Sequence, residues 1–96
     1  MRNRYVISYD VANPKRLAKV FKKMRGFGDT VQLSVFQCDL SKQELILVKA
    51  ALLRLINERE DKVVIIDCGP VGGRGDECFE FLGRREPAIE KAAVVV

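Results

Sequence analysis

The order of strand-like and helix-like stretches is the sequence feature that most limits the possible folds of this chain. The patterns predict, in order, a strand over residues 4–9, a helix over 14–25, β-rich residues over 30–40, a second helix ending near Asn57, and a short apolar strand over 63–66. This β-α-β-β-α-β order is typical of the ferredoxin-like split βαβ arrangement. The sequence therefore predicts an α+β, ferredoxin-like βαββαβ sandwich, in which one antiparallel sheet carries both helices on one face.

Side-chain periodicity defines the strands. The first strand has a period of two, with Tyr5, Ile7 and Tyr9 on one face, and it ends at Asp10. Residues 30–40 are long for one strand, so we expect either a kinked strand or two short strands. The wholly apolar run over residues 63–66 is typical of a central strand.

Terminal signals define the two helices. Asn13 is a favoured N-cap for the first helix, Pro14 is favoured at its first position, and Gly26 is a natural residue just past its end. The second helix follows a capping box formed by Ser41 and Glu44. The apolar stripe of the first helix consists of Leu17, Val20, Phe21 and Met24.

The last third of the chain has a different character. Residues 1–68 are predicted to form the ferredoxin-like domain, and residues 69–75 are rich in glycine and predict a loop. Residues 92–96 form an apolar, strand-like end. Because an unpaired apolar strand invites aggregation, this end is expected to pair with an edge of its own sheet or of a partner's sheet. We favour a partner protomer, because the glycine-rich segment gives the end reach, and we expect residues 69–96 to supply this additional strand. The chain is therefore predicted to form a homodimer.

Composition excludes several classes of enzyme and of site. The 96 residues include no histidine, which excludes hydrolases with a Ser-His or Cys-His pair and removes the commonest zinc ligand. The three cysteines show no C-x-x-C spacing, and we interpret Cys38 and Cys68 as small buried apolar residues. No apolar run approaches the ~20 residues that a membrane span needs. We expect a cytoplasmic protein with no membrane partner.

Charge is concentrated in the first third of the chain. The first 30 residues contain eight Lys or Arg and two Asp, a net charge of +6. Such clustering indicates either a polyanionic partner or an ordinary solvated helix face. Lys15 and Arg16 lie in the first turn of the helix, where the helix dipole disfavours cations, which hints at a ligand that supplies negative charge. The basic residues opposite the apolar stripe are Lys15, Arg16, Lys19, Lys22 and Lys23.

Asp10 is the candidate for chemistry. Without histidine, phosphodiester hydrolysis needs either a metal held by carboxylates or no metal at all. Mg²⁺ takes oxygen ligands and is often held by one or two carboxylates, with water and phosphate completing its shell. A two-fold dimer could bring two copies of Asp10 together at one metal. The alternative interpretation is an Asp that only caps a strand-to-helix turn.

Three segments together resemble the CRISPR-associated protein 2 family. They are Tyr5-Val-Ile-Ser-Tyr9-Asp10, then Lys15-Arg16-Leu-Ala-Lys19, then Val31-Gln32-Leu-Ser34-Val35-Phe36 with Leu40 four residues later. The resemblance covers residues 4–57 well, and residues 58–68 fit the next strand. It differs from the usual family pattern at Asn13, Thr30 and Leu33, where acidic, basic and aromatic residues are common.

The resemblance implies a ferredoxin-like homodimer whose C-terminal strands cross between protomers. It implies a role in CRISPR adaptation, in which the dimer joins two dimers of the CRISPR-associated integrase and contacts the DNA to be inserted. Members of the family are described as Mg²⁺-dependent endonucleases on RNA or DNA. Asp10 then becomes the catalytic residue and metal ligand, with Tyr9, Ser34 and Phe36 supporting it, and the basic helix residues become a nucleic-acid surface.

Three functional hypotheses stay open from the sequence. The first is a Mg²⁺-dependent endonuclease, and the second is a non-catalytic dimeric scaffold that binds DNA and bridges integrase dimers. The third, outside the family, is a small regulatory domain that binds a metabolite. Phe36 has the alternative interpretation of a simple core residue.

Overall fold

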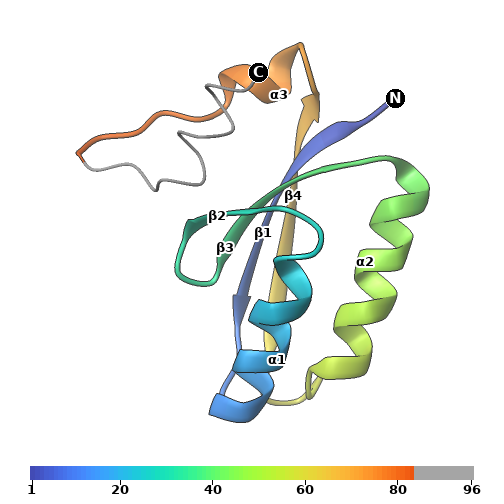
Figure 1. The fold of residues 1–96 in the computed structure, drawn as a ribbon, viewed down its shortest axis with the longest axis vertical. Coiled ribbons are helices and arrows are strands. Elements are labelled where there is room, and N and C mark those ends of the chain that lie inside the picture. The colour runs from blue at the N-terminus through green and yellow to red at the C-terminus, as the bar shows by residue number, and fades with distance from the viewer. Residues whose placement is uncertain (84–96) are drawn as a thin grey trace.

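A computed structural model, which describes residues 1–83, contains a four-stranded antiparallel sheet with two long helices packed on one face (Figure 1). The strands lie in the order β2-β3-β1-β4. This arrangement confirms the predicted α+β, ferredoxin-like βαββαβ sandwich. The elements are β1 (Asn3–Asp10), α1 (Pro14–Met24), β2 (Asp29–Gln32), β3 (Val35–Leu40), α2 (Lys42–Leu55), β4 (Lys62–Pro70) and a short α3 (Arg74–Glu77).

The β-rich segment forms two strands, the second of the two predicted possibilities. The chain turns at Leu33 and Ser34, where Ser34 adopts a left-handed conformation with φ of 66°. Just before β2, Gly28 approaches β3 so closely that a Cβ atom there would overlap the Gln37 carbonyl oxygen. The glycine after α1 that the fold requires sterically is therefore Gly28, whereas Gly26 follows the C-cap residue Arg25.

The last strand departs from the prediction in position and in length. Within the described residues β4 pairs only with β1 and lies at the sheet edge, so its predicted central position is wrong for the single chain. Its apolar run has another cause: Val63 and Ile65 pack against the core, while Val64 and Ile66 are 43% and 51% exposed on the opposite face. The strand also extends through Gly69 to Pro70, where a loop was predicted.

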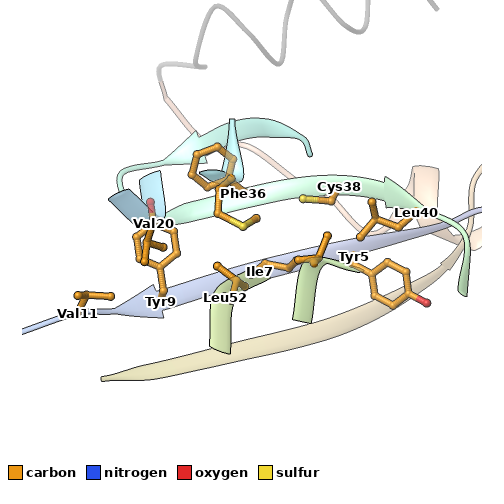
Figure 2. Close-up of a cluster of buried hydrophobic side chains, with 11 residues drawn as sticks. Tyr5, Ile7, Tyr9, Val11, Val20, Phe36, Cys38, Leu40 and Leu52 are labelled. Atoms are coloured by element: carbon orange, nitrogen blue, oxygen red, sulfur yellow. The ribbon is translucent and has the colours of Figure 1, made fainter. Parts of the chain in front are cut away.

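The core lies between the sheet and the two helices (Figure 2). Phe36 is fully buried at its centre, stacked on Tyr9 with ring centroids 6.2 Å apart and edge-on to Phe21 at 5.6 Å. Cys38 is buried as predicted, and burial raises the pKa of its thiol to about 12, so this cysteine is unreactive at neutral pH. Cys68 is only half-buried, because it lies on the edge strand. The buried residues are Tyr5, Ile7, Tyr9, Val11, Val20, Met24, Phe36, Cys38, Leu40, Val48 and Leu52.

The region after β4 is only partly described. Residues 74–77 form the short helix α3, which overlaps the end of the loop predicted over 69–75. The predicted C-terminal strand over residues 92–96 lies outside the described residues. Over residues 1–83, no helix is long and apolar enough to cross a membrane.

The capping box at the start of α2 forms as predicted. The Glu44 backbone N–H donates to the Ser41 hydroxyl at 3.1 Å, and the Ser41 backbone N–H donates to the Glu44 carboxylate at 2.8 Å. The same carboxylate accepts from Arg2 Nε at 2.9 Å, which ties the N-terminus to α2. The hydrogen bond from Arg2 and then that from the Ser41 backbone lower the pKa of Glu44 to about 2.

The Glu44 carboxylate makes stability depend on pH in a defined window. Because its folded-state pKa is lowered from an ordinary value of 4.5, the stabilisation is fully present above that value and is lost as pH falls toward 2. Glu44→Gln keeps a capping-box residue but removes the charge. We expect its melting temperature to be about 3 °C below that of the wild type at pH 7. Thermal unfolding should show this gap closing by pH 2, and Glu58→Gln, in an exposed turn, serves as the control. A gap that stays constant with pH would contradict the assignment.

Candidate nucleic-acid and metal site

Asp10 lies at the end of β1, on the sheet face that carries no long helix. Residues on β1 alternate, so Tyr9 faces the helices while Ser8 and Asp10 face the other side. Asp10 is exposed and is paired in register with Lys62 on β4. Because directly opposed residues share one face, the Asp10 carboxylate and the Lys62 ammonium lie on the same side of the sheet.

A single chain offers little to a metal ion at this position. Among residues 1–83, no group of three or more acidic or cysteine side chains is arranged to hold one. Asp10 supplies one exposed carboxylate, which suits Mg²⁺ chemically, but Lys62 is a competing cation across the strand pair. A complete site therefore needs ligands from elsewhere, such as the Asp10 of a second copy, together with water and phosphate.

The turn after Asp10 is built around Asn13. The Asn13 side chain accepts from the backbone N–H groups of Lys15 and Arg16 at 2.9 and 3.1 Å, which is the predicted N-cap. The amide oxygen is thus committed to holding the first turn of α1. Asn13 is therefore a helix cap at the position where the resemblance led us to expect an acidic residue.

The structure separates the five predicted phosphate-binding residues into two groups. Arg16 has a side chain that is only 24% exposed and that is paired within the chain. Its Nε donates to Asp61 at 2.9 Å, and its Nη2 donates to Glu60 at 2.9 Å. The negative charge near Arg16 in the first turn therefore comes from the protein itself. The four exposed basic residues on α1 are Lys15, Lys19, Lys22 and Lys23.

Asp61 is a site-supporting residue that the sequence analysis did not identify. Its side chain is fully buried and accepts from the backbone N–H groups of Ala12 at 2.9 Å and Asn57 at 2.8 Å, in addition to Arg16. The Arg16 guanidinium, more than any other neighbour, holds the pKa of this carboxyl well below its usual range. The residue joins the turn after Asp10 to the turn before β4. In the sequence Asp61 stands in a charged turn. Only its position four residues after Asn57 indicates the hydrogen bond between the Asn57 backbone N–H and the Asp61 carboxylate.

The three predicted supporting residues lie together on the helix side of the sheet. The Tyr9 backbone N–H donates to the Ser34 carbonyl oxygen at 3.1 Å, and the Tyr9 ring stacks on Phe36. Burial raises the pKa of the Tyr9 phenol, and the nearby Ser34 side chain offsets part of that rise. Tyr9 and Asp10 are neighbours in sequence, yet their side chains face opposite sides of β1. Phe36, being fully buried, packs the core and does not reach Asp10.

Comparisons with known proteins agree with this fold over most of the chain. A family model described as CRISPR associated protein Cas2 matches residues 2–70. A protein named CRISPR-associated endoribonuclease Cas2, from Geobacter sulfurreducens, is 37% identical over 99% of this chain and 100% of its own length. A Rhodospirillum rubrum protein named CRISPR-associated endoribonuclease Cas2 1 is 41% identical over 96% of this chain and 89% of its own.

Solved structures agree as well. The crystal structure of Streptococcus pyogenes Cas2 at pH 6.5 superposes with a TM-score of 0.70 at 30% identity, covering 83% of this chain and 99% of that one. The crystal structure of a hypothetical protein TT1823 from Thermus thermophilus gives a TM-score of 0.76 at 29% identity, covering 90% and 96%. The matched family model, the near full-length relatives and the shared fold lead to one conclusion: this chain belongs to the CRISPR-associated protein Cas2 family.

Proposed function

We propose that this protein is a homodimeric endonuclease that binds nucleic acid and hydrolyses phosphodiester bonds in RNA or DNA with Mg²⁺. The names of the relatives support the nuclease activity. The observation that carries the proposal is the position of Asp10, an exposed carboxylate on the sheet face opposite the two long helices. We further propose a cytoplasmic role in spacer acquisition with dimers of the CRISPR-associated integrase, which rests on family membership.

The same face supports association with a second copy. Val64 and Ile66 are paired in register with Ser8 and Val6, so these four side chains lie on the Asp10 side of the sheet. Half-exposed Val and Ile side chains on a sheet face are stabilised when a partner covers them. Packing this face against its equivalent would place two copies of Asp10 in one interface, which is the arrangement that a shared metal requires.

In this proposal each Asp10 would provide one carboxylate ligand to a shared Mg²⁺ site. Mg²⁺ bound there would polarise the phosphoryl group and activate a water molecule. Asp61 and Asn13 hold the turn that follows Asp10, the former through Ala12 and the latter through the first turn of α1. The exposed lysines of α1 contribute phosphate contacts that are independent of base sequence.

Cleavage of labelled RNA and labelled duplex DNA by the purified protein tests the proposal. We expect products with Mg²⁺ and a loss of at least about 100-fold in rate after chelation by EDTA, because the activated water is lost. The activity should return when excess Mg²⁺ is added back. Cleavage that is unchanged by EDTA would contradict the metal-dependent mechanism.

A second candidate function is a non-catalytic dimeric scaffold that binds DNA and bridges integrase dimers. The small number of possible metal ligands favours this function, because the described residues of one chain offer no group of three metal-binding side chains. The scaffold needs only the basic face of α1 and the dimer. Absence of cleavage of either substrate, together with salt-sensitive binding of DNA, would favour it over the nuclease.

A further inference from the structure

A small apolar pocket opens between α1 and the turn that joins β2 to β3. Its lining is apolar except at one end. Leu33 stands at its rim with 87% exposure, and Ala18 is exposed on the helix side. The residues that line it are Tyr9, Pro14, Leu17, Ala18, Phe21, Leu33 and Ser34.

The volume of this pocket is about 260 Å³. This volume is below the range of roughly 300–1,000 Å³ that is usual for drug-sized ligands, so the pocket suits a single ring system.

One polar group at this pocket makes no well-formed hydrogen bond. Tyr9 is only 4% exposed, and its hydroxyl is buried without a hydrogen bond of standard geometry to any described residue, although the Ser34 side chain lies near enough to lower the pKa of the phenol. A buried hydroxyl without a partner costs free energy, so its presence in a folded protein calls for a ligand or a water molecule that satisfies it. The Ser34 side chain lies on the same wall of the pocket and adds a second hydroxyl.

The charged residues around the pocket opening indicate the chemistry of a ligand whose ring could occupy the pocket. Lys15 and Lys22 lie three residues before and four residues after Ala18, so they flank Ala18 on the surface of α1. Both lysines are exposed. An apolar, ring-sized pocket with hydroxyl groups at one end and two cations at its rim matches a heteroaromatic base attached to a phosphate backbone.

We propose that this pocket, lined by Tyr9, Ala18 and Leu33, binds an unpaired nucleobase of a single-stranded nucleic acid. The base packs against the apolar walls, the Tyr9 hydroxyl hydrogen-bonds to a heteroatom on its edge, and Lys15 and Lys22 contact the phosphates on either side. The inference deepens the proposed function, because it rests on nucleic-acid binding by α1. It does not depend on cleavage, since Tyr9 and Asp10 face opposite sides of β1.

Binding of intact and abasic oligonucleotides tests this proposal. The probes are single-stranded 10-mers of RNA and of DNA, each with a counterpart in which every base is replaced by an abasic spacer, so that the phosphates are kept. Fluorescence anisotropy in EDTA measures binding without cleavage. We expect the wild type to bind the intact strands about tenfold more tightly than the abasic strands, because base packing is lost in the latter. Comparing RNA with DNA distinguishes the two sources of the base.

Two variants locate the effect in the pocket. Ala18→Leu fills the pocket from α1 and should reduce the preference for intact strands to near one, with little change in the affinity for abasic strands. Tyr9→Phe removes only the hydroxyl and should weaken the preference a few-fold without lowering the melting temperature. Ala50→Leu, on the exposed face of α2, is the matched control and should keep the full preference.

The outcomes separate this proposal from the proposed function. Equal affinity of the wild type for intact and abasic strands overturns the base pocket but leaves the nuclease standing. If the preference for intact strands survives in Ala18→Leu, the base binds outside this pocket and the base-pocket proposal is also overturned. If the wild type binds neither the intact nor the abasic strands, both proposals are contradicted. A changed sedimentation of the dimer in Ala18→Leu, with base preference unaltered, assigns the pocket to a protein contact instead.

Discussion

Replacing Asp10 by alanine is expected to lower the rate of RNA or DNA cleavage by at least about 100-fold, because the carboxylate that holds the metal is lost. Asp10 is exposed at the end of β1, so the substitution leaves the core intact and the melting temperature nearly unchanged. Single-turnover cleavage of labelled strands measures the rate. Sedimentation and circular dichroism establish that the variant keeps its fold and its oligomeric state.

The matched control for this substitution is Asp29→Ala, which removes an exposed aspartate from β2. It should cleave at the wild-type rate, because β2 lies two strands away from β1 in the sheet. Cleavage that survives in Asp10→Ala would contradict the catalytic assignment and favour the scaffold. Spacer acquisition that survives in the same variant would favour the scaffold independently of any cleavage assay.

Reversing the charge of Lys19 and Lys23 together is expected to weaken DNA binding by roughly 60-fold at 0.1 M salt. Each phosphate contact releases counterions and is worth roughly eightfold at that salt concentration, so two lost contacts multiply. Both lysines are exposed on α1, where glutamate is also a good helix former. Titrations at several salt concentrations should show a smaller salt dependence for the Lys19→Glu, Lys23→Glu variant than for the wild type.

The control is the equivalent double reversal on the other helix, Lys42→Glu with Lys49→Glu. These lysines are exposed on α2, so the variant carries the same change of net charge at a different place. It should keep most of the affinity for DNA. If both double variants lose affinity equally, the net charge of the protein matters and the assignment to α1 is wrong.

Local patterns in the sequence were sufficient for most of the fold. The period of two at Tyr5, Ile7 and Tyr9 predicts the buried face of β1, because alternate side chains of a strand face opposite sides. Asn13 and the Ser41 capping box predict where the helices begin, since these side chains bond to neighbouring backbone groups. Such signals depend on residues a few positions apart, which is why they can be read without the structure.

The candidate site was only partly predictable. Asp10 could be singled out because it ends a strand in a chain without histidine, but its pairing in register with Lys62 of β4 became clear only in the structure. Arg16 looked equivalent to the neighbouring lysines. Its pairing with Asp61 joins residues 45 positions apart, and no local pattern reports a contact at that separation.

The sequence by itself determined the order of the elements, the starts of the two long helices, the buried face of β1 and the basic character of α1. These properties follow from side-chain period, capping and charge, all of which act over short distances along the chain. Only the tertiary structure decided that β4 lies at the edge beside β1, that Asp61 neutralises Arg16, and that Tyr9 holds a buried hydroxyl at a pocket. Those features depend on which distant segments pack together, because burial and pairing arise from the whole fold.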